Sequence, residues 1–318
     1  MTDNSPKPAS GPLRAGIAGA GVFGGYHASK YVADPRVEFV GVFDPVRDHA
    51  EALCARQGGR AFEALGELLD AIDVLTVTSP AVFHHDAAHR ALQAGKPVLV
   101  EKPIAATLDE ARELVTLAAA NALPLQVGHQ ERFVFEAMGL FQPGLPALEA
   151  LEARRIGTPS ARNLDVSVTL DLMIHDIDLV LALAGADPVS IRAEMHAERG
   201  GLADHITTVL TFETGLQAKL ESSRVAAERA RTMTLGYQGG AGLDVDFIAK
   251  TFDHAHGLDL NAGFADTEMA RDSLGEGVKR FVTSVLDGSP VAVPGQAGLA
   301  ALETALAIDA AAGSISRI

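Results

Sequence analysis

From residue 13 to about residue 128, short runs of apolar and β-branched residues alternate with longer stretches of helical periodicity. This alternation is typical of a parallel sheet with helices on both faces, because strands that are buried on both sides read as continuous apolar runs. We expect helices at residues 24–33, 45–57, 62–69, 83–94 and 108–121, the last with Thr107 as its N-cap. We expect strands at residues 14–19, 37–43, 74–78, 98–100 and 125–127.

Beyond residue 128 the pattern changes. Residues 206–212, 216–222 and 232–237 alternate apolar with polar side chains, which is the pattern of strands with one buried and one solvated face. Thr214 and Gly215 supply a hairpin turn. Further helices are expected at residues 172–184, 275–286 and 297–311.

These patterns predict an α/β protein. A flexible polar tail occupies residues 1–12, and a doubly wound parallel sheet occupies residues 13–128. Residues 129–318 are expected to form an α+β domain with a mainly antiparallel, open-faced sheet.

The composition narrows the class of partner. The chain has 26 lysines and arginines against 41 aspartates and glutamates, a formal net charge of −15. A field of this sign repels phosphate backbones, so we expect no nucleic-acid or membrane partner, and an anionic ligand must be held by local groups. Cys54 is the only cysteine and cannot form an intramolecular disulfide. With no long apolar stretch and no secretory signal, the sequence predicts a cytoplasmic protein.

A GxGxxG motif directly follows the first expected strand and opens the first expected helix. Gly19 allows the tight turn, Gly21 lets the backbone approach a pyrophosphate, and Gly24 permits close packing of helix on strand. Val22 and Phe23 belong to the same turn, and the unpaired N–H groups of the helix start face the anion. The motif alone is weak, but its context predicts a dinucleotide-binding Rossmann domain.

Asp44 ends the second expected strand, 20 residues after Gly24. A carboxylate at this place accepts hydrogen bonds from the adenosine ribose and repels a 2′-phosphate, which favours NAD over NADP. Arg47 lies close enough to keep NADP open. The other interpretation of Asp44 is a turn residue before Pro45.

The stretch VEKP places Glu101, Lys102 and Pro103 at the carboxyl edge of the sheet, where open α/β folds bind their ligands. Here the sequence resembles the glucose-fructose oxidoreductase and inositol dehydrogenase family, called Gfo/Idh/MocA. The matching segments run in the family's order: GAGVFGGYH, SPAVFHHDAAHRALQAGKPVLVEKP, VGHQERF and DLMIHDIDL.

The resemblance implies site residues. Lys102 would contact the nicotinamide ribose and the substrate, and Asp171 and His175, which fit the family's DxxxH spacing, would act on the reacting hydroxyl. Residues four apart share one helix face, so both side chains can point the same way, although such a pair is more often a surface pair. The resemblance also places His84 beside the cofactor, and the cofactor groove is expected to be lined by Ser79, Pro80 and Glu101.

Oxidation of a secondary alcohol needs a base within hydrogen-bond reach of the hydroxyl as hydride leaves the same carbon. His175 is our candidate, because an ordinary imidazole pKa near 6.5 lets it accept and return a proton at neutral pH. Lys102 would stabilise developing alkoxide charge. Asp171 would orient the substrate or raise the basicity of His175.

Four arginines suggest the substrate. Arg154, Arg155 and Arg162, together with Arg132, could clamp a diphosphate, a pattern similar to the family branch that oxidises the 3-hydroxyl of UDP-N-acetylglucosamine. The alternative is that these arginines lie at strand ends or at an oligomer interface and bind no substrate. The alternatives for function are a dehydrogenase of a free polyol such as inositol and a non-catalytic NAD sensor.

The remaining histidines give no metal site. His85 and His89 are four apart, as a metal pair would be, but we interpret them as surface residues, and His254 and His256 as loop residues. An open sheet face with alternating Val, Leu and Phe tends to find a partner, so we expect a homodimer or homotetramer.

Overall fold

The computed structural model describes residues 11–159, 166–198, 202–254 and 257–314. The chain divides into two compact units. The first comprises residues 1–128 and 274–295, and the second comprises residues 129–273 and 296–318. The segment 274–295, expected in the second domain, thus belongs to the first unit, and the expected tail lies almost entirely outside the described residues.

In the described part of the first unit, a parallel sheet has six strands in the order β3-β2-β1-β4-β5-β6. β4 and β5 are buried at every position, which is why they read as unbroken apolar runs. β3 was not expected, because its exposed first residue, Arg60, leaves only Ala61 and Phe62 as an apolar signal, whereas the equally short β5 and β6 begin and end with buried apolar residues. The strands are β1 (Leu13–Ala18), β2 (Val37–Phe43), β3 (Arg60–Phe62), β4 (Val74–Val77), β5 (Val98–Val100) and β6 (Leu125–Val127).

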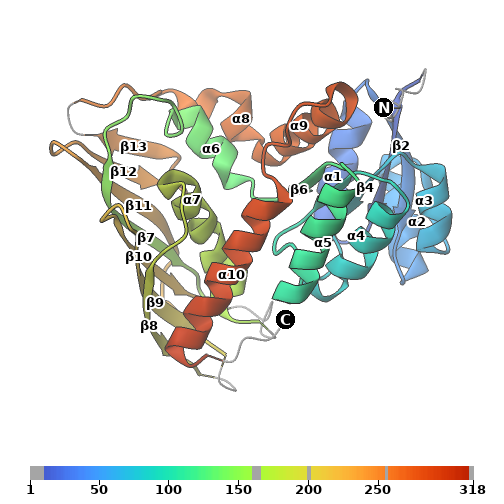
Figure 1. Cartoon of the computed structure of the whole chain (residues 1–318). Helices are drawn as coiled ribbons and strands as arrows, with labels where there is room; N and C mark the ends of the chain where they lie inside the picture. Colours follow the sequence, from blue (N-terminus) through green and yellow to red (C-terminus); the bar gives the residue numbers. More distant parts are fainter. Residues whose placement is uncertain (1–10, 160–165, 199–201, 255–256, 315–318) are drawn as a thin grey trace. The chain divides into compact units, whose positions relative to one another are not determined.

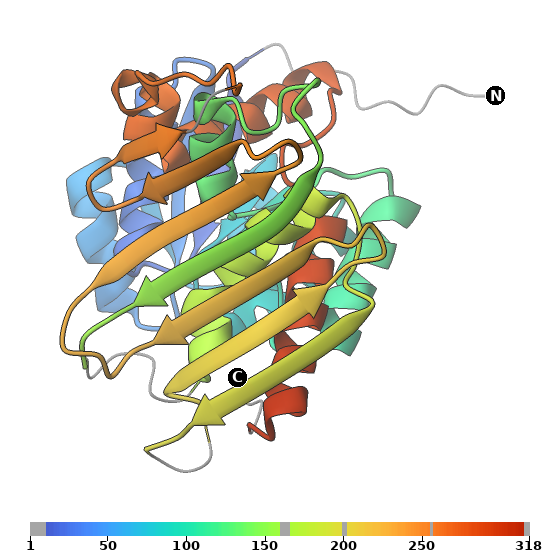
Figure 2. The ribbon, with the colours of Figure 1, turned by 90° about the vertical axis from the view of Figure 1, so that its left-hand side faces the viewer.

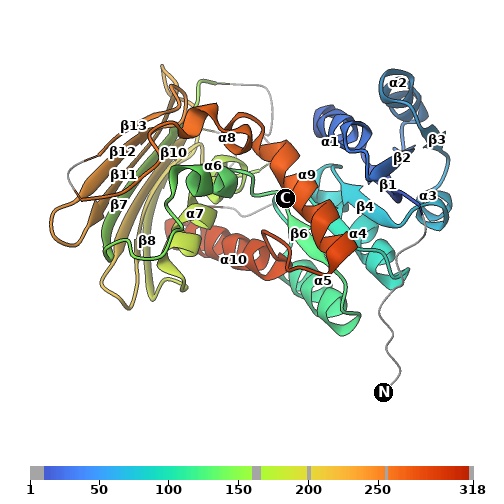
Figure 3. The ribbon, with the colours of Figure 1, turned by 90° about the horizontal axis from the view of Figure 1, so that it is seen from above.

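Helices cover both faces of this sheet (Figure 1), with α1 and α2 on one face and α3, α4 and α5 on the other (Figure 3). α5 begins with the expected capping box: Thr107 Oγ1 accepts from Glu110 N, and the Glu110 carboxylate accepts from Thr107 N. The helices are α1 (Val22–Ala33), α2 (Arg47–Gln57), α3 (Leu65–Ala71), η1 (Ala81–Phe83), α4 (His84–Gln93), α5 (Leu108–Ala120) and α9 (Ser273–Asp287).

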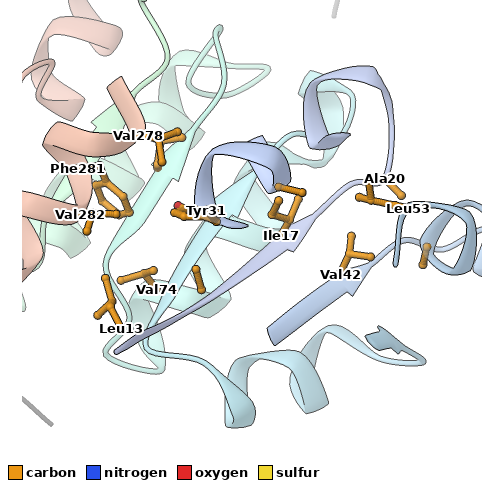
Figure 4. Packing of buried hydrophobic residues seen from close by; sticks show 14 residues of the cluster. Leu13, Ile17, Ala20, Tyr31, Val42, Leu53, Val74, Val278, Phe281 and Val282 are labelled. Atoms are coloured by element: carbon orange, nitrogen blue, oxygen red, sulfur yellow. The ribbon is translucent and has the colours of Figure 1, made fainter. Parts of the chain in front are cut away.

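α9 returns to the first unit because its apolar side completes that unit's core. Val278, Phe281 and Val282 are buried together with Leu13 and Tyr31, as Figure 4 shows. Sequence proximity had placed α9 with the second domain, since periodicity shows that a helix has an apolar side but not which core receives it.

In the described part of the second unit, a sheet has seven strands in the order β13-β12-β11-β7-β10-β9-β8. All neighbours are antiparallel except β10 and β7 (Figure 2). The mainly antiparallel sheet was expected, but its central strand β7 was not, because LEALEARRI is rich in Glu and Arg. The strands are β7 (Leu148–Ile156), β8 (Ser190–His196), β9 (His205–Thr211), β10 (Gln217–Ser223), β11 (Ala230–Tyr237), β12 (Gly242–Asp246) and β13 (Thr251–His254).

One face of this sheet packs against helices, and Figure 3 shows α6, α7 and α10 on that face. In α6, for example, the ring of Phe135 stacks on Phe247 with the centroids 5.8 Å apart. The second unit contains α6 (Glu131–Met138), η2 (Thr169–Met173), α7 (Ile174–Ala184), η3 (Phe264–Asp266), α8 (Glu268–Arg271) and α10 (Gly295–Ala312).

The opposite, open face of the sheet is polar. Ion pairs join Lys219 to Glu152 and Arg154 to Glu221 across neighbouring strands. The expectation of an open face lined by Val, Leu and Phe was wrong, because most of these side chains point to the face that the helices cover. In the described ranges, no helix is both long and apolar enough to cross a membrane.

Candidate functional site

The glycine turn links β1 to α1. Gly19 has a φ of +110°, and a Cβ on it would lie 2.5 Å from the backbone N of Ser79. A Cβ on Gly24 would lie 2.1 Å from the backbone O of Gly19. Both positions therefore need glycine for packing within the protein.

Gly21 differs from the other two glycines. It is the N-cap of α1 with a φ of −69°, which any residue can adopt. A Cβ on it would meet no described protein atom within 4 Å. Glycine here serves no packing in the described protein but leaves room for a ligand to approach the backbone. Val22 and Phe23 follow with side chains 64% and 46% exposed.

Asp44 directly follows β2 and binds the same turn. Its Oδ2 accepts a hydrogen bond from the N–H of Ala20 at 2.8 Å, and its Oδ1 accepts one from the N–H of Val46 at 2.9 Å. Asp44 is therefore a turn residue and is also held beside the glycine turn, so the two interpretations of this aspartate are compatible.

Arg47 opens α2 and is engaged by carboxylates. Its guanidinium donates to Glu51 at 2.6 Å and also to Glu63. These hydrogen bonds raise the pKa of Arg47 above its ordinary value. The charge that would favour a 2′-phosphate is thus already balanced by two acidic side chains.

His84 joins the turns that follow β4 and β5. Its buried ring places Nδ1 2.7 Å from the carbonyl of Pro103 and Nε2 2.8 Å from the carbonyl of Ser79. Burial lowers the pKa of His84, although the contacts with the two carbonyls act in the opposite direction. Ser79 Oγ is buried and has no hydrogen-bond partner among the described residues. Pro80 precedes η1 and is exposed.

Glu101 follows β5 and is buried against α1. Its Oε1 lies 2.7 Å from Nε2 of His27, whose side chain is also buried. Burial raises the pKa of Glu101, but the hydrogen bond with His27 and the positive charges of His27, Lys102 and His84 together outweigh it, so the pKa lies below its ordinary value. The next residue, Lys102, is half-buried and is joined to Pro103 by a cis peptide bond.

The first unit thus gathers its predicted cofactor residues at the carboxyl ends of β1, β2, β4 and β5. The shared contacts are those between the glycine turn and Ser79, between Asp44 and Ala20, and between His84 and the turns on either side of it. This is the edge at which doubly wound sheets bind nucleotides.

In the second unit, Asp171 and His175 lie at the junction of η2 and α7. η2 is a π-helical turn in which the N–H of Ile174 donates to the carbonyl of Thr169, five residues back. The expected α-helix is therefore widened at Asp171, and such insertions are frequent at functional sites. Both side chains are half-buried.

Asp309 of α10 anchors this π-helical turn. Its buried carboxylate accepts hydrogen bonds from Ser167 Oγ at 2.6 Å and from Thr169 Oγ1 at 2.5 Å. The turn that carries Asp171 is thus fixed by side chains whose importance no sequence motif indicated.

Glu131, the first residue of α6, faces His175. Glu131 Oε1 lies 3.9 Å from His175 Nδ1, and both carboxylate oxygens accept hydrogen bonds from Arg155. Arg155 also donates to both oxygens of Asp176, at 2.8 and 2.9 Å. Burial raises the pKa of Asp176, whereas the two carboxylates hold the pKa of Arg155 above its ordinary value against the effect of burial.

Glu131 and Asp176 were not among the residues predicted from the sequence. Each stands beside a residue that was singled out, Glu131 next to Arg132 and Asp176 next to His175. Both lie in segments that resemble the Gfo/Idh/MocA family, VGHQERF and DLMIHDIDL, and this position was the sequence signal that could have identified them.

Arg132, Arg154 and Arg155, the three described members of the predicted arginine clamp, do not form it. Arg132 donates to both oxygens of Asp178, at 2.6 and 2.7 Å, and Arg155 is committed to Glu131 and Asp176. Arg154 points to the open face and pairs with Glu221. Successive residues of a strand point to opposite faces, so Arg154 and Arg155 cannot share a ligand. Arg162 lies outside the described residues.

His85 and His89 both contact one carboxylate, that of Glu113 on α5, at 2.9 and 3.1 Å. Within the ranges that the structure describes, no group of three or more His, Cys, Asp or Glu is arranged to hold a metal ion. His256 and the side chain of His254 lie outside those ranges.

Known proteins resemble nearly the whole of this chain. The UDP-N-acetylglucosamine 3-dehydrogenase of Acidithiobacillus ferrooxidans is 35% identical over 93% of this chain and 96% of its own length. The model of an oxidoreductase family with an NAD-binding Rossmann fold matches residues 13–129, and that of the family's C-terminal domain matches residues 151–241. The chain belongs to the Gfo/Idh/MocA oxidoreductase family.

Two further Gfo/Idh/MocA comparisons bear on fold and substrate. The solved structure of the A. ferrooxidans enzyme matches with a TM-score of 0.87 and 34% identity, covering 95% of this chain and 98% of the other. The inositol 2-dehydrogenase of Rhizobium meliloti is 26% identical over 96% of this chain and 97% of its own length. The predicted combination of a Rossmann domain with a mainly antiparallel sheet is confirmed.

The residues of the first unit fit the family's cofactor, NAD. Gly21 leaves space where a Cβ would stand, Ser79 Oγ is a buried polar atom without a described partner, and the Asp44 carboxylate is fixed beside the turn. The space at Gly21 suits the pyrophosphate of a dinucleotide, and the Asp44 carboxylate suits the adenosine ribose. The Ser79 hydroxyl suits a polar group of the same ligand.

Proposed function

We propose that this protein is an NAD-dependent dehydrogenase that oxidises the 3-hydroxyl of UDP-N-acetylglucosamine. The observation that carries the chemistry is His175, a half-buried imidazole on α7 whose Nδ1 faces the carboxylate of Glu131 at 3.9 Å. The nucleotide sugar is taken from the A. ferrooxidans relative, which matches nearly the whole chain.

His175 is assigned the proton transfer. A neutral imidazole accepts the proton of the substrate hydroxyl as the C–H bond breaks, and returns it in the reverse reaction. Glu131 supports this role, because its negative charge beside Nδ1 stabilises the imidazolium that forms. Arg155 holds the Glu131 carboxylate in place by hydrogen bonds to both of its oxygens.

Lys102 of the first unit and Asp171 of the second are assigned to the same hydroxyl, as the family resemblance implies. The ammonium of Lys102 stabilises the negative charge that develops on oxygen, and Asp171 orients the substrate. Bound NAD supplies the hydride acceptor at C4 of its nicotinamide. Gly19, Gly21, Val22, Phe23, Gly24, Asp44, Ser79, Pro80, His84 and Glu101 are assigned to holding NAD.

The cofactor preference follows from charge. Asp44 repels a 2′-phosphate, and Arg47 is balanced by Glu51 and Glu63. We therefore assign the enzyme to NAD rather than NADP.

The substrate assignment is tested by measuring NADH formation with UDP-N-acetylglucosamine, myo-inositol and glucose. The proposal expects the nucleotide sugar to be oxidised with the highest kcat/KM. Preferential oxidation of myo-inositol would favour the second candidate, which rests on similarity to inositol 2-dehydrogenases. Tight NAD binding without turnover of any sugar would favour a sensor.

The base is tested by His175→Gln. Turnover should fall by roughly 10²–10⁴-fold, because general base catalysis is lost, while the Kd of NAD stays unchanged. The matched control is His205→Gln on the open face of the sheet, which should behave as wild type. Full turnover of His175→Gln would remove His175 from this role.

The proposal also includes a cytoplasmic location and a homodimer or homotetramer. The face of the seven-stranded sheet on which no described helix packs is the surface that remains for a second copy, and the ion pairs described on it join residues of the same chain. Light scattering that returns only the 33.2 kDa monomer would contradict this part.

A further inference from the structure

Arg231 lies beside the buried charges around His175. It stands on β11 directly opposite Arg155 of β7. Residues directly opposite each other on paired strands point to the same face of a sheet. Arg155 points to the helix-covered face, where it binds Asp176 of α7, so Arg231 points to that face too.

The two arginines differ in their partners. Arg155 donates to Glu131 and Asp176. The guanidinium of Arg231 makes no hydrogen bond or ion pair with any described residue, although it is half-buried. The guanidinium of Arg229, two residues earlier and exposed, also makes no hydrogen bond or ion pair with a described residue. Its positive charge is close enough to lower the pKa of Arg231. In a chain of net charge −15, neither of these neighbouring arginines pairs with a carboxylate of the described residues.

The surroundings of Arg231 are those of an anion site. Burial, followed by the positive charge of Arg155, lowers the pKa of Arg231, and Glu131 and Asp176 offset this only in part. A half-buried guanidinium with unused donors is costly, and an oxyanion that accepts from its planar fork removes that cost. The site lies near His175, because Glu131 interacts with both Arg231 and His175.

We infer that Arg231, assisted by Arg229, binds an oxyanion of the substrate, which is the diphosphate of a nucleotide sugar. The inference rests on the proposed function and deepens it. In a sugar that is oxidised at C3, the phosphate on C1 is two carbons from the reacting centre, so an anion site in the neighbourhood of His175 suits this substrate. A free polyol has no group that would use it.

The assignment replaces the clamp expected from the sequence. Arg132 and Arg155 donate their hydrogen bonds to carboxylates of the protein. Arg231 donates to no described residue and lies on the strand next to that of Arg155. An arginine suits this role better than a lysine, because its fork gives two parallel hydrogen bonds to a phosphate.

A purely structural role for Arg231 makes a different prediction. As a counter-charge for Glu131 and Asp176, Arg231 would act on every substrate equally. As an anion-binding residue, it acts on UDP and UDP-N-acetylglucosamine but not on a neutral sugar. The comparison of charged with neutral ligands separates the two roles.

The experiment measures UDP binding by calorimetry, and KM and kcat for UDP-N-acetylglucosamine, in wild type, Arg231→Gln, Arg231→Lys and Arg229→Gln. Arg231→Gln should weaken UDP binding and raise KM by about 10- to 100-fold, the range of one charge-assisted bidentate contact, with a smaller change in kcat. Arg231→Lys should be intermediate, because the charge remains and the fork is lost. Arg229→Gln should have a smaller effect than Arg231→Gln.

The matched control is Arg192→Gln, an exposed arginine on the open face of the same sheet, which should leave both constants unchanged. If wild type neither binds UDP nor oxidises UDP-N-acetylglucosamine, the proposed function fails and the inference fails with it. If wild type does both and Arg231→Gln matches Arg192→Gln, only the inference fails. Equal losses with UDP-N-acetylglucosamine and with a neutral sugar would likewise overturn it.

Discussion

Gly21 and Gly24 of the turn should respond differently to one added methyl group. Gly21→Ala should leave the unliganded thermal midpoint unchanged, because its Cβ meets no described protein atom within 4 Å and its φ of −69° suits alanine. It should weaken NAD binding about tenfold or more, roughly 1.4 kcal/mol, because the methyl group occupies the space into which the pyrophosphate comes.

Gly24→Ala is the contrasting variant. Its Cβ would lie 2.1 Å from the backbone O of Gly19, so the turn itself must shift. We expect the unliganded protein to lose roughly 1–3 kcal/mol of stability. Differential scanning fluorimetry without NAD and calorimetric titration with NAD separate the two effects. A lowered midpoint in Gly21→Ala would show that glycine at this position serves the fold.

Asp44 and Arg155 show how far the contacts of a charged residue can be predicted from the sequence. The Asp44 carboxylate was expected beside the glycine turn and is held there by the N–H of Ala20. The prediction of an arginine clamp was wrong for the described arginines, because a charged residue in the sequence does not show which group of opposite charge it will meet in the fold. Arg155 could be seen as a cation, but only the fold brings Asp176 and Glu131 to it.

At the scale of elements, an ion pair just past the end of α1 adds a polar link to α9 beside their shared core. Arg36 donates to Asp34, just past the end of α1, and to Thr283 Oγ1 on α9 at 2.9 Å. The hydrogen bonds from Arg36 hold the pKa of Asp34 below its ordinary value. The folded state therefore favours the charged carboxylate, and its contribution is present above the unfolded pKa and is lost as the pH falls through the folded pKa.

Asp34→Asn should consequently cost about 1 kcal/mol near neutral pH, since the pair is partly exposed. The difference from wild type should shrink as the pH falls below about 4, the ordinary value for aspartate. Urea unfolding followed by circular dichroism at several pH values measures it. Asp70→Asn, an exposed aspartate on α3, is the control. A difference that stays constant with pH would contradict the assignment.

Elements with a local signal were predicted well. The capping box at Thr107 fixes the start of α5 through residues three apart, so the sequence alone locates it. β7 has no such signal, because its Glu and Arg residues alternate between ion pairs on the open face and contacts on the covered face. The π-helical turn at Asp171 depends on Asp309, far along the chain.

At the scale of the whole molecule, the chain crosses between its two units more than once. Phe281 of α9 is fully buried in the core of the first unit, although most of the second unit precedes it in the sequence. Phe281→Ala should therefore destabilise the first unit by roughly 3–5 kcal/mol. Because NAD binds the folded first unit, saturating NAD should restore part of the lost thermal stability.

Leu286→Ala is the control for this change. Leu286 lies on the same helix but is 40% exposed, so the substitution should cost less than about 0.5 kcal/mol. Calorimetric scans with and without NAD measure both variants. If Phe281→Ala and Leu286→Ala melted alike, the core contact of α9 would carry little energy.

The sequence by itself determined the parallel sheet, the glycine turn, the aspartate beside it and the mainly antiparallel second sheet. These features follow from periodicity or from motifs whose members lie within about 25 residues of one another, so the necessary information is local. Tertiary structure alone decided that α9 joins the first unit, that Glu131 faces His175 and that Arg231 keeps its donors available. Each of these depends on which distant groups meet, and burial and charge pairing select among partners only after the chain has folded.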